Sequence, residues 1–316
     1  MAQFIIRRAV LLVFTLLLTS VIIFAISQVL PGDVARVLLG REAGEEAVQA
    51  LRNELGLNDP LPTRYVHWLS DFVHGDWGIS YSNNEKPIYP MVMERLGHSI
   101  WLAGVTLVFS VPLALALGLF AGLNANKPID AVISISSLAL VGLPEFVTGI
   151  ILINVLSSQW HLVPPSSSPI GPNTTFFEAF PYLILPAITA TIVMLAYIIR
   201  LTRAGVIEVL KKAYVRTAVL KGLPWWQVVT SHVLRNSLLP TVTVIAISFG
   251  WLISGLVVIE NVFGYPGLGA LLTFSISRRD LLLMQAIAMV TVFFYTLANF
   301  IADLLYAYLN PRIRLE

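Results

Sequence analysis

The chain has 316 residues, of which 57% are hydrophobic and 12% charged, with a mean hydropathy of +0.80 and a net charge of +2. Soluble domains carry about 25% charged residues, so a water-facing surface is excluded, and the small net charge gives no indication of a nucleic-acid partner. The absence of cysteine excludes disulfides, thiolate metal sites, iron–sulfur clusters and a cysteine nucleophile. The composition is that of a membrane protein whose surface faces lipid.

Six stretches are apolar enough to cross a bilayer, whose core of about 30 Å needs about 20 helical residues. They cover residues 10–29, 99–123, 131–156, 182–201, 238–259 and 281–309. Arg7 and Arg8 precede the first stretch and leave a signal peptide as an alternative. The apolar run is too long for a signal-peptide core and no A-x-A-like cleavage site follows, which favours a permanent span. The predicted fold class is therefore all-α, a polytopic membrane protein with six transmembrane helices.

The positions of Lys and Arg predict the topology. They precede the first stretch, follow the last, and gather between the fourth and fifth. Residues 31–97 instead hold six Lys and Arg against ten Asp and Glu, and residues 159–180 hold no Lys or Arg. Arg278 and Arg279 are the exception. Both termini are predicted to be cytoplasmic. The expected domains are an N-terminal span (1–30), an external helical cap (31–97) and a five-span core (98–316) that includes a cytoplasmic loop (202–237).

The external cap is predicted to contain two short helices. Apolar residues recur at helical spacing over 47–55 and 65–72, and Gly56 and Gly75 are natural stops after them. We expect the apolar faces to fold onto the membrane-embedded body. Contact with an external partner is the alternative.

Two ionisable residues lie inside the predicted spans, where charges are costly and usually face a bundle interior or a cavity. Glu145, directly after Pro144, is a candidate for lining a transport pathway. Asp303 lies nearer a cytoplasmic end, where pairing with a neighbour is the alternative. Prolines inside the apolar stretches would kink helices that open and close, although proline is also common in membrane helices.

The loop over residues 202–237 gives the strongest local signal. It is basic and mostly helical in pattern, and Gly222 and Pro224 interrupt it. Gly222 suits the left-handed end of one helix and Pro224 the first turn of the next, which predicts two short helices at an angle. A basic amphipathic segment can lie on anionic lipid or dock into a groove of another protein. Docking is favoured because this is the one long loop predicted on the cytoplasmic side.

This loop resembles the EAA loop of ABC importer permeases. Arg216-Thr217-Ala218 stand in the place of Glu-Ala-Ala, and Gly222 follows at the family spacing, whereas Arg235 replaces the family's usual proline. The run from Tyr214 to Leu223 is similar to the dipeptide, oligopeptide and nickel branch. Further similar pieces extend along the chain in order: Pro31-Gly32-Asp33, Gly75-Asp76-Trp77-Gly78-Ile79-Ser80, Glu260-Asn261-Val262-Phe263, Pro266-Gly267-Leu268-Gly269, Arg279-Asp280 and Asn310-Pro311-Arg312.

The resemblance implies a non-catalytic permease subunit of the bacterial inner membrane that forms half of a translocation pathway. Its partners would be a second, related permease, two ABC ATPases that bind ATP and Mg, and a periplasmic binding protein, and this chain would hold no cofactor. Short peptides are the commonest cargo of the branch; nickel chelates, glutathione, opines and some sugars are alternatives.

The resemblance also implies site residues. The expected ATPase contact, a coupling helix, comprises Tyr214, Arg216, Thr217, Ala218, Lys221, Gly222 and Leu223. The expected pathway or outer mouth comprises Glu145, chosen for its charge inside a span, together with Glu260, Phe263, Pro266, Gly267 and Gly269. The glycines and the proline of the second group would equally serve a plain re-entrant turn.

Two other classes of protein are weighed against this one. The chain has no Gly-Lys pair, which excludes a Walker-type ATP site, and no His-Glu pair, which excludes an H-E-x-x-H zinc site. Gly97-His98-Ser99 begins like a G-x-S-x-G nucleophile elbow, but Trp101 replaces its last glycine, which disfavours a membrane enzyme. A secondary transporter would need no ATPase, but usually has an internal repeat and several ionisable groups at mid-membrane.

Overall fold

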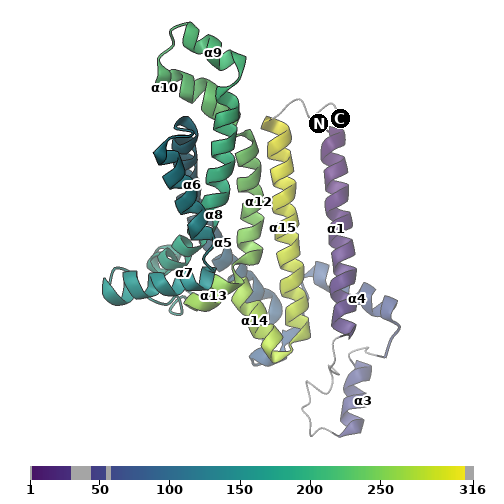
Figure 1. The fold of residues 1–316 in the computed structure, drawn as a ribbon. Coiled ribbons are helices and arrows are strands. Elements are labelled where there is room, and N and C mark those ends of the chain that lie inside the picture. Colours follow the sequence, from purple (N-terminus) through teal and green to yellow (C-terminus); the bar gives the residue numbers. More distant parts are fainter. Residues whose placement is uncertain (1, 30–43, 55–57, 310–316) are drawn as a thin grey trace.

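The computed structural model describes residues 2–29, 44–54 and 58–309, which are almost wholly helical (Figure 1). Four helices of this part are long and apolar enough to cross a bilayer: α1 (Ala2–Val29), α5 (Ile88–Leu123), α8 (Phe176–Leu210) and α15 (Leu281–Leu309). Each of them contains one of the predicted spans. At 1.5 Å per residue, the 28 residues of α1 extend about 42 Å, which matches a bilayer with its headgroups.

The other apolar segments are broken. Helix α6 (Pro128–Val141) meets α7 (Glu145–Leu152) at a bend of 100°, and the π-helical segment η2 (Ile153–Gln159) continues α7. The prediction of one helix over 131–156 is wrong, because Pro144 adopts φ −57° and ψ 137° and starts a new helix there.

The predicted fifth span is also too long. Helix α12 (Leu239–Gly255) ends early and is followed by α13 (Val257–Phe263) and α14 (Leu268–Arg278), which bend by 87° relative to each other. A run of apolar residues does not reveal such a turn, because residues on both sides of the break are equally apolar. The count of six crossings therefore stays a prediction.

Helices α5 and α8 form the centre of the molecule and touch along a seam of small residues. A Cβ on Gly118 would lie 2.6 Å from Cβ of Thr202, and a Cβ on Gly122 would lie 2.7 Å from Cβ of Val206. Glycines four residues apart let two membrane helices approach backbone to backbone. Two successive turns of α5, at Gly118 and Gly122, therefore pack closely against α8. Helix α8 itself starts with a capping box between Thr175 and Glu178.

Helix α15 lies between α12 and α1 (Figure 1). Near one end of the α1–α15 pair, Arg8 forms a salt bridge of 2.6 Å with Asp303. Near the other end, the amide of the buried Gln285 donates to Ser27 Oγ at 2.6 Å. The interpretation that Asp303 pairs with a neighbour is confirmed.

The cap contains α3 (Glu45–Glu54) and α4 (Leu61–His74), and Gly75 ends α4 at φ 86° as predicted, whereas Gly56 lies outside the described residues. Helix α4 packs on α1: the Tyr65 ring centroid is 5.5 Å from that of Phe24, and the Tyr65 hydroxyl is 2.7 Å from Ser20 Oγ. The expectation that the cap folds onto the membrane-embedded body is therefore confirmed for α4.

A small hairpin follows α4. Strand β1 (Ile79–Ser80) pairs with antiparallel β2 (Lys86–Pro87) across η1 (Tyr81–Asn83). The carboxylate of Asp280, just before α15, accepts hydrogen bonds from Ser80 Oγ and Ser82 Oγ, both at 2.7 Å. Two of the sequence motifs, Gly75 to Ser80 and Arg279-Asp280, thus meet in the fold.

The two ends of the molecule differ in content (Figure 1). The start of α1 and the end of α15 lie at the same end as α9 (Ala213–Leu220) and α10 (Trp225–Gln227). Helices α3, α4 and α14 lie at the opposite end.

Candidate functional site

The basic loop folds into two helical segments, as predicted. Helix α9 is separated from the next segment by Gly222 at φ 77° and by Pro224, which lies directly before α10. Helix α10 continues through the π-helical segment η3 (Val228–Leu234) into α11 (Arg235–Ser237), which leads to α12. The backbone at Gly222 is in the left-handed region, which favours glycine.

The loop has a small core of its own. Val215 and Ala218 of α9 pack with Val228 and Val233 of η3 against the end of α8. Ala218 is 4% exposed. The methyl group of Ala218 therefore faces the loop's own core, where it lets the two segments pack closely, and its contact with a partner stays a prediction.

The outer surface of the loop exposes large apolar side chains, and the same loop carries several exposed Lys and Arg residues. The exposed fraction is 79% for Leu220 and 69% for Trp226, and Tyr214 and Trp225 are also exposed. The other residues predicted for this contact are exposed too, except Leu223, which is half-buried: Arg216, Thr217, Lys221 and Gly222. Large apolar side chains this exposed beyond the ends of α6, α12 and α15 indicate a protein contact (Figure 1). We name Tyr214, Leu220, Trp225 and Trp226 the docking tip.

A partly buried ion pair connects the base of this loop to the rest of the molecule. Arg203 of α8 binds Asp130 of α6 through two hydrogen bonds, Nε to Oδ1 at 2.5 Å and Nη2 to Oδ2 at 2.7 Å. The backbone N–H of Asn126 donates to Asp130 Oδ2 at 2.9 Å. The planar guanidinium thus fixes the angle between α6 and α8 one turn before the loop core.

At the opposite end, the α13–α14 turn closes around Glu260. Its carboxylate accepts hydrogen bonds from Ser99 Oγ at 3.1 Å and from the backbone N–H of Ala270 at 2.8 Å. A Cβ on Gly267 would overlap this carboxylate, so only glycine fits there. The side chain of Glu260 is 1% exposed.

All of the predicted mouth residues in this turn are buried: Glu260, Phe263, Pro266, Gly267 and Gly269. Within the described chain these residues build the turn, as the alternative interpretation has it, and their place at an outer mouth stays a prediction. The carboxylate needs buried hydrogen-bond donors because an unpaired charge is costly there.

The same turn explains the sequence that began like a nucleophile elbow. Ser99 Oγ accepts a hydrogen bond from the N–H of Leu268 at 2.9 Å while it donates to Glu260. His98 Nδ1 lies 3.0 Å from the carbonyl oxygen of Pro266, and the Tyr265 hydroxyl donates to the His98 carbonyl oxygen at 2.6 Å. These contacts attach α5 to the turn.

Glu145 stands apart from this cluster. It starts α7 at the 100° bend, and its Oε2 atom is buried with no hydrogen-bond partner among the described residues. Helix α7 packs on α13 where Gly149 faces Val262 and Phe263. A buried carboxylate oxygen without a partner at a helix break is a candidate for lining a transport pathway.

Comparison with known proteins identifies the family. Residues 114–315 match the model described as "Binding-protein-dependent transport system inner membrane component", and residues 1–103 match the corresponding N-terminal model. The chain belongs to this family. It is therefore a permease subunit of a binding-protein-dependent ABC importer, a non-catalytic multi-pass protein of the inner membrane that works with an ATPase and a substrate-binding protein.

Full-length relatives of this permease carry cargo names. It is 35% identical over 314 residues to the "Probable peptide ABC transporter permease protein y4tP" of Sinorhizobium fredii, covering 99% of this chain and 100% of the relative. It is 34% identical to the "Glutathione transport system permease protein GsiC" of Escherichia coli K12, covering 99% of each. A crystal structure of an amino acid ABC transporter with histidines matches 71% of this chain and 94% of its own, at 16% identity and a TM-score of 0.48.

Sequence reasoning about this permease missed the polar contacts between distant residues. Arg203 was counted only as a basic loop residue, and Asp130 was not singled out, yet they lie 73 residues apart and form a bidentate pair. No local pattern marks such a pair. The contact of Glu260 with Ser99, 161 residues away, is of the same kind.

Proposed function

We propose that this permease forms half of the translocation pathway for short peptides, including tripeptides of the size of glutathione. A periplasmic binding protein delivers the cargo and a second, related permease completes the pathway. The names of the full-length relatives, one a peptide permease and one a glutathione permease, support this cargo class. The nickel chelate, opine and sugar cargoes remain alternatives.

The exposed apolar residues of the docking tip support the proposal that α9 is the coupling helix. Leu220 and Trp226 expose apolar surface at the end of the molecule, and the same loop carries the exposed basic residues Lys211, Lys212, Arg216 and Lys221. An amphipathic helix with exposed anchors is the form that docks into a groove of a partner protein. The excess of Lys and Arg at this end supports a cytoplasmic location for the tip and for both termini.

The contacts at the base of the loop provide a route for motion. Val206 and Val209 join the loop core to α8, the Arg203–Asp130 pair joins α8 to α6, and the Gly118–Gly122 seam joins α8 to α5. When ATP-driven closure brings two ATPases together, these three helices would move with the tip. Tilting of the helices would then open the pathway on the other side of the membrane.

The test of coupling is Leu220→Glu. We expect the variant to insert normally, to lose ATPase co-purification by about tenfold and to lose ATP-driven uptake, because a charge replaces an apolar anchor. The matched control is Leu162→Glu, since Leu162 is similarly exposed (66%) outside the loop. Normal ATP-driven uptake by the Leu220 variant would contradict the coupling role. Ala218 is unsuitable for this test, because a charge there would disrupt the loop core itself.

The test of cargo is ATP-driven uptake into proteoliposomes that contain the complete transporter and its binding protein. Labelled dipeptides and glutathione are expected to accumulate and to compete with each other. Uptake of a nickel chelate, opine or sugar without competition from peptides would overturn the peptide cargo and leave the coupling role in place.

Glu145 is proposed as a pathway residue. Its unpartnered oxygen at the bend between α6 and α7 supports this role. Glu145→Gln is expected to lower the uptake rate several-fold with ATPase co-purification unchanged. Unchanged uptake of every accepted cargo would contradict it.

A further inference from the structure

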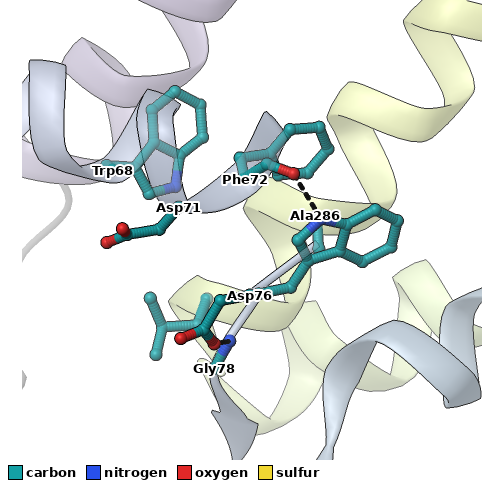
Figure 2. A pocket seen from close by; sticks show the side chains of 8 residues that line it. Trp68, Asp71, Phe72, Asp76, Gly78 and Ala286 are labelled. Atoms are coloured by element: carbon teal, nitrogen blue, oxygen red, sulfur yellow. Dashed lines mark hydrogen bonds between the residues drawn. The ribbon is translucent and has the colours of Figure 1, made fainter. Parts of the chain in front are cut away.

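A cavity of about 240 Å³ lies in the cap, between α4, the segment that follows it and the start of α15 (Figure 2). The residues that line it include Trp68, Asp71, Phe72, Asp76, Trp77 and Ala286. Because water occupies about 30 Å³, the volume has room for a polar headgroup of several non-hydrogen atoms. None of these residues belongs to the docking tip or to the Glu260 turn.

One wall of the cavity is aromatic and fixed. The rings of Phe72 and Trp77 are stacked, with centroids 4.8 Å apart and an interplanar angle of 3°. The Trp77 indole N–H donates to the Phe72 carbonyl oxygen at 2.9 Å (Figure 2), and the Trp68 ring lies 6.0 Å from that of Phe72. Indole rings attract organic cations, and both Trp68 and Trp77 are only partly buried, so this wall provides one side of a cation site.

Two exposed aspartates also line the cavity. In Figure 2 the carboxylates of Asp71 and Asp76 both lie on the side away from Ala286. Asp76 Oδ1 accepts one hydrogen bond from the N–H of Gly78 at 3.2 Å. Within the part of the chain that the structure describes, neither carboxylate forms an ion pair. Two anionic groups beside aromatic faces favour a cation that donates hydrogen bonds, a primary ammonium, over a quaternary one.

The position of the cavity in the bilayer identifies the source of such a cation. Ala286 lies in the second turn of α15, whose 29 residues extend about 43 Å, the thickness of a bilayer with its headgroups. The start of α15 is therefore at headgroup level. Trp68 of α4 contacts Phe24, in the last two turns of α1 (centroids 5.6 Å apart), and tryptophan is typical of this layer.

The opposite face of α4 is consistent with lipid contact. Val66 and Val73 lie seven residues apart on this helix and are both exposed. Apolar side chains on an amphipathic helix at headgroup level are placed to contact acyl chains. The cavity, on the other face of α4, is therefore at the level of lipid headgroups.

We propose that this cavity binds the primary-ammonium headgroup of an ethanolamine phospholipid, in the leaflet at the end opposite the docking tip. The ammonium lies between the carboxylates of Asp71 and Asp76 and against the indole faces, and the phosphate stays in the headgroup layer. The lipid then holds α4 against the start of α15. This role is separate from ATPase docking and from cargo choice.

The test is lipid retention by the intact, purified transporter, measured by native mass spectrometry with ethanolamine and choline phospholipids of identical acyl chains. The wild-type protein is expected to retain the ethanolamine lipid roughly fivefold better, the range of a few exposed charge contacts. Asp71→Asn combined with Asp76→Asn is expected to abolish this preference. The matched control, Asp59→Asn with Glu85→Gln, removes the same charge from exposed cap residues outside the cavity and should keep it.

Two further readouts separate binding from folding. The melting temperature of the Asn variant in detergent without lipid is expected to equal that of the wild type. Trp68→Leu, which keeps both carboxylates, is expected to reduce the preference about twofold. Equal retention of both lipids by the wild type, or a preference that survives in the Asn variant, would overturn the proposal. So would an Asn variant that keeps the lipid preference but loses a protein partner, because the cavity would then be a protein-docking site.

Discussion

The basic loop over residues 202–237, called the docking loop from here on, and the α13–α14 turn have similar sequence features. They differ in which side chains they bury and which they expose. Each is a short helical segment interrupted by glycine and proline. The turn directs its polar group inward: the Glu260 carboxylate is surrounded by Ser99, Gly267 and the N–H of Ala270. The loop buries only a few small residues and leaves Leu220 and Trp226 exposed.

This difference separates motifs that build the fold from motifs that serve a partner. A motif whose groups satisfy one another inside one chain needs no second protein to explain it. A motif that leaves large apolar groups in solvent is complete only when another surface covers them. The turn is therefore expected to control assembly of the permease, and the loop to control its coupling to ATP hydrolysis.

The largest loss of stability is expected from Gly267→Ala, which tests whether the α13–α14 turn is part of the fold. The added Cβ overlaps the Glu260 carboxylate, which must then lose buried hydrogen bonds, at a cost of about 3 kcal/mol. We expect a large fall in apparent melting temperature and in the yield of monodisperse protein. The matched control is Gly104→Ala on α5, where a Cβ meets nothing within 4 Å and stability should hold. Equal behaviour of the two variants would show that the turn tolerates displacement of its carboxylate.

A smaller effect is expected from Asp130→Asn, which tests the link between the loop and the membrane helices. The change leaves Arg203 with a neutral partner and should cost about 2 kcal/mol, below the value for a fully buried pair because the Arg203 side chain is 30% exposed. Asp303→Asn, in a pair with exposed fractions of 41% and 32%, should cost less than about 1 kcal/mol. The comparison is made by thermal melting, and an equal or reversed order would contradict the assignment of Asp130 as an anchor.

A small effect on stability is also expected from Gly222→Ala in the loop. The residue has φ 77° with nothing within 4 Å of an added Cβ, so the cost is backbone strain alone, about 1 kcal/mol. Melting temperature should barely change, because the loop core remains packed. ATPase co-purification should fall several-fold, since the strain alters the angle between α9 and α10. A variant that loses stability as strongly as Gly267→Ala would mean that the loop, too, is part of the fold's core.

The sequence was sufficient to predict what depends on local pattern. Apolar runs located the four long helices, Gly75 and Gly222 adopt the left-handed backbone that their positions predicted, and the family resemblance was confirmed by comparison. Composition alone placed the chain in a membrane. These features follow from residues close together in the chain, or from composition, and need no knowledge of tertiary contacts.

Other features depended on distant residues. Pro144 was noticed as a possible kink, but neither its 100° bend nor the packing of α7 on α13 can be inferred from nearby residues. Ala218 was assigned to the ATPase contact by resemblance, and its burial depends on Val228 and Val233, which the chain reaches only after the turn at Gly222. The cap motifs could not predict the hydrogen bonds by which Asp280 holds the hairpin, because Asp280 lies 200 residues from Ser80.

The length of α8 has a mechanical consequence. Its 35 residues extend about 52 Å, so part of it stands outside a bilayer core of about 30 Å and acts as a lever arm on the docking loop's side. A rotation of about 10° around its midpoint would displace each end by about 4–5 Å. The close contacts at Gly118 and Gly122 leave no room for α5 to slide along α8. A force applied at the loop would therefore rotate both helices together.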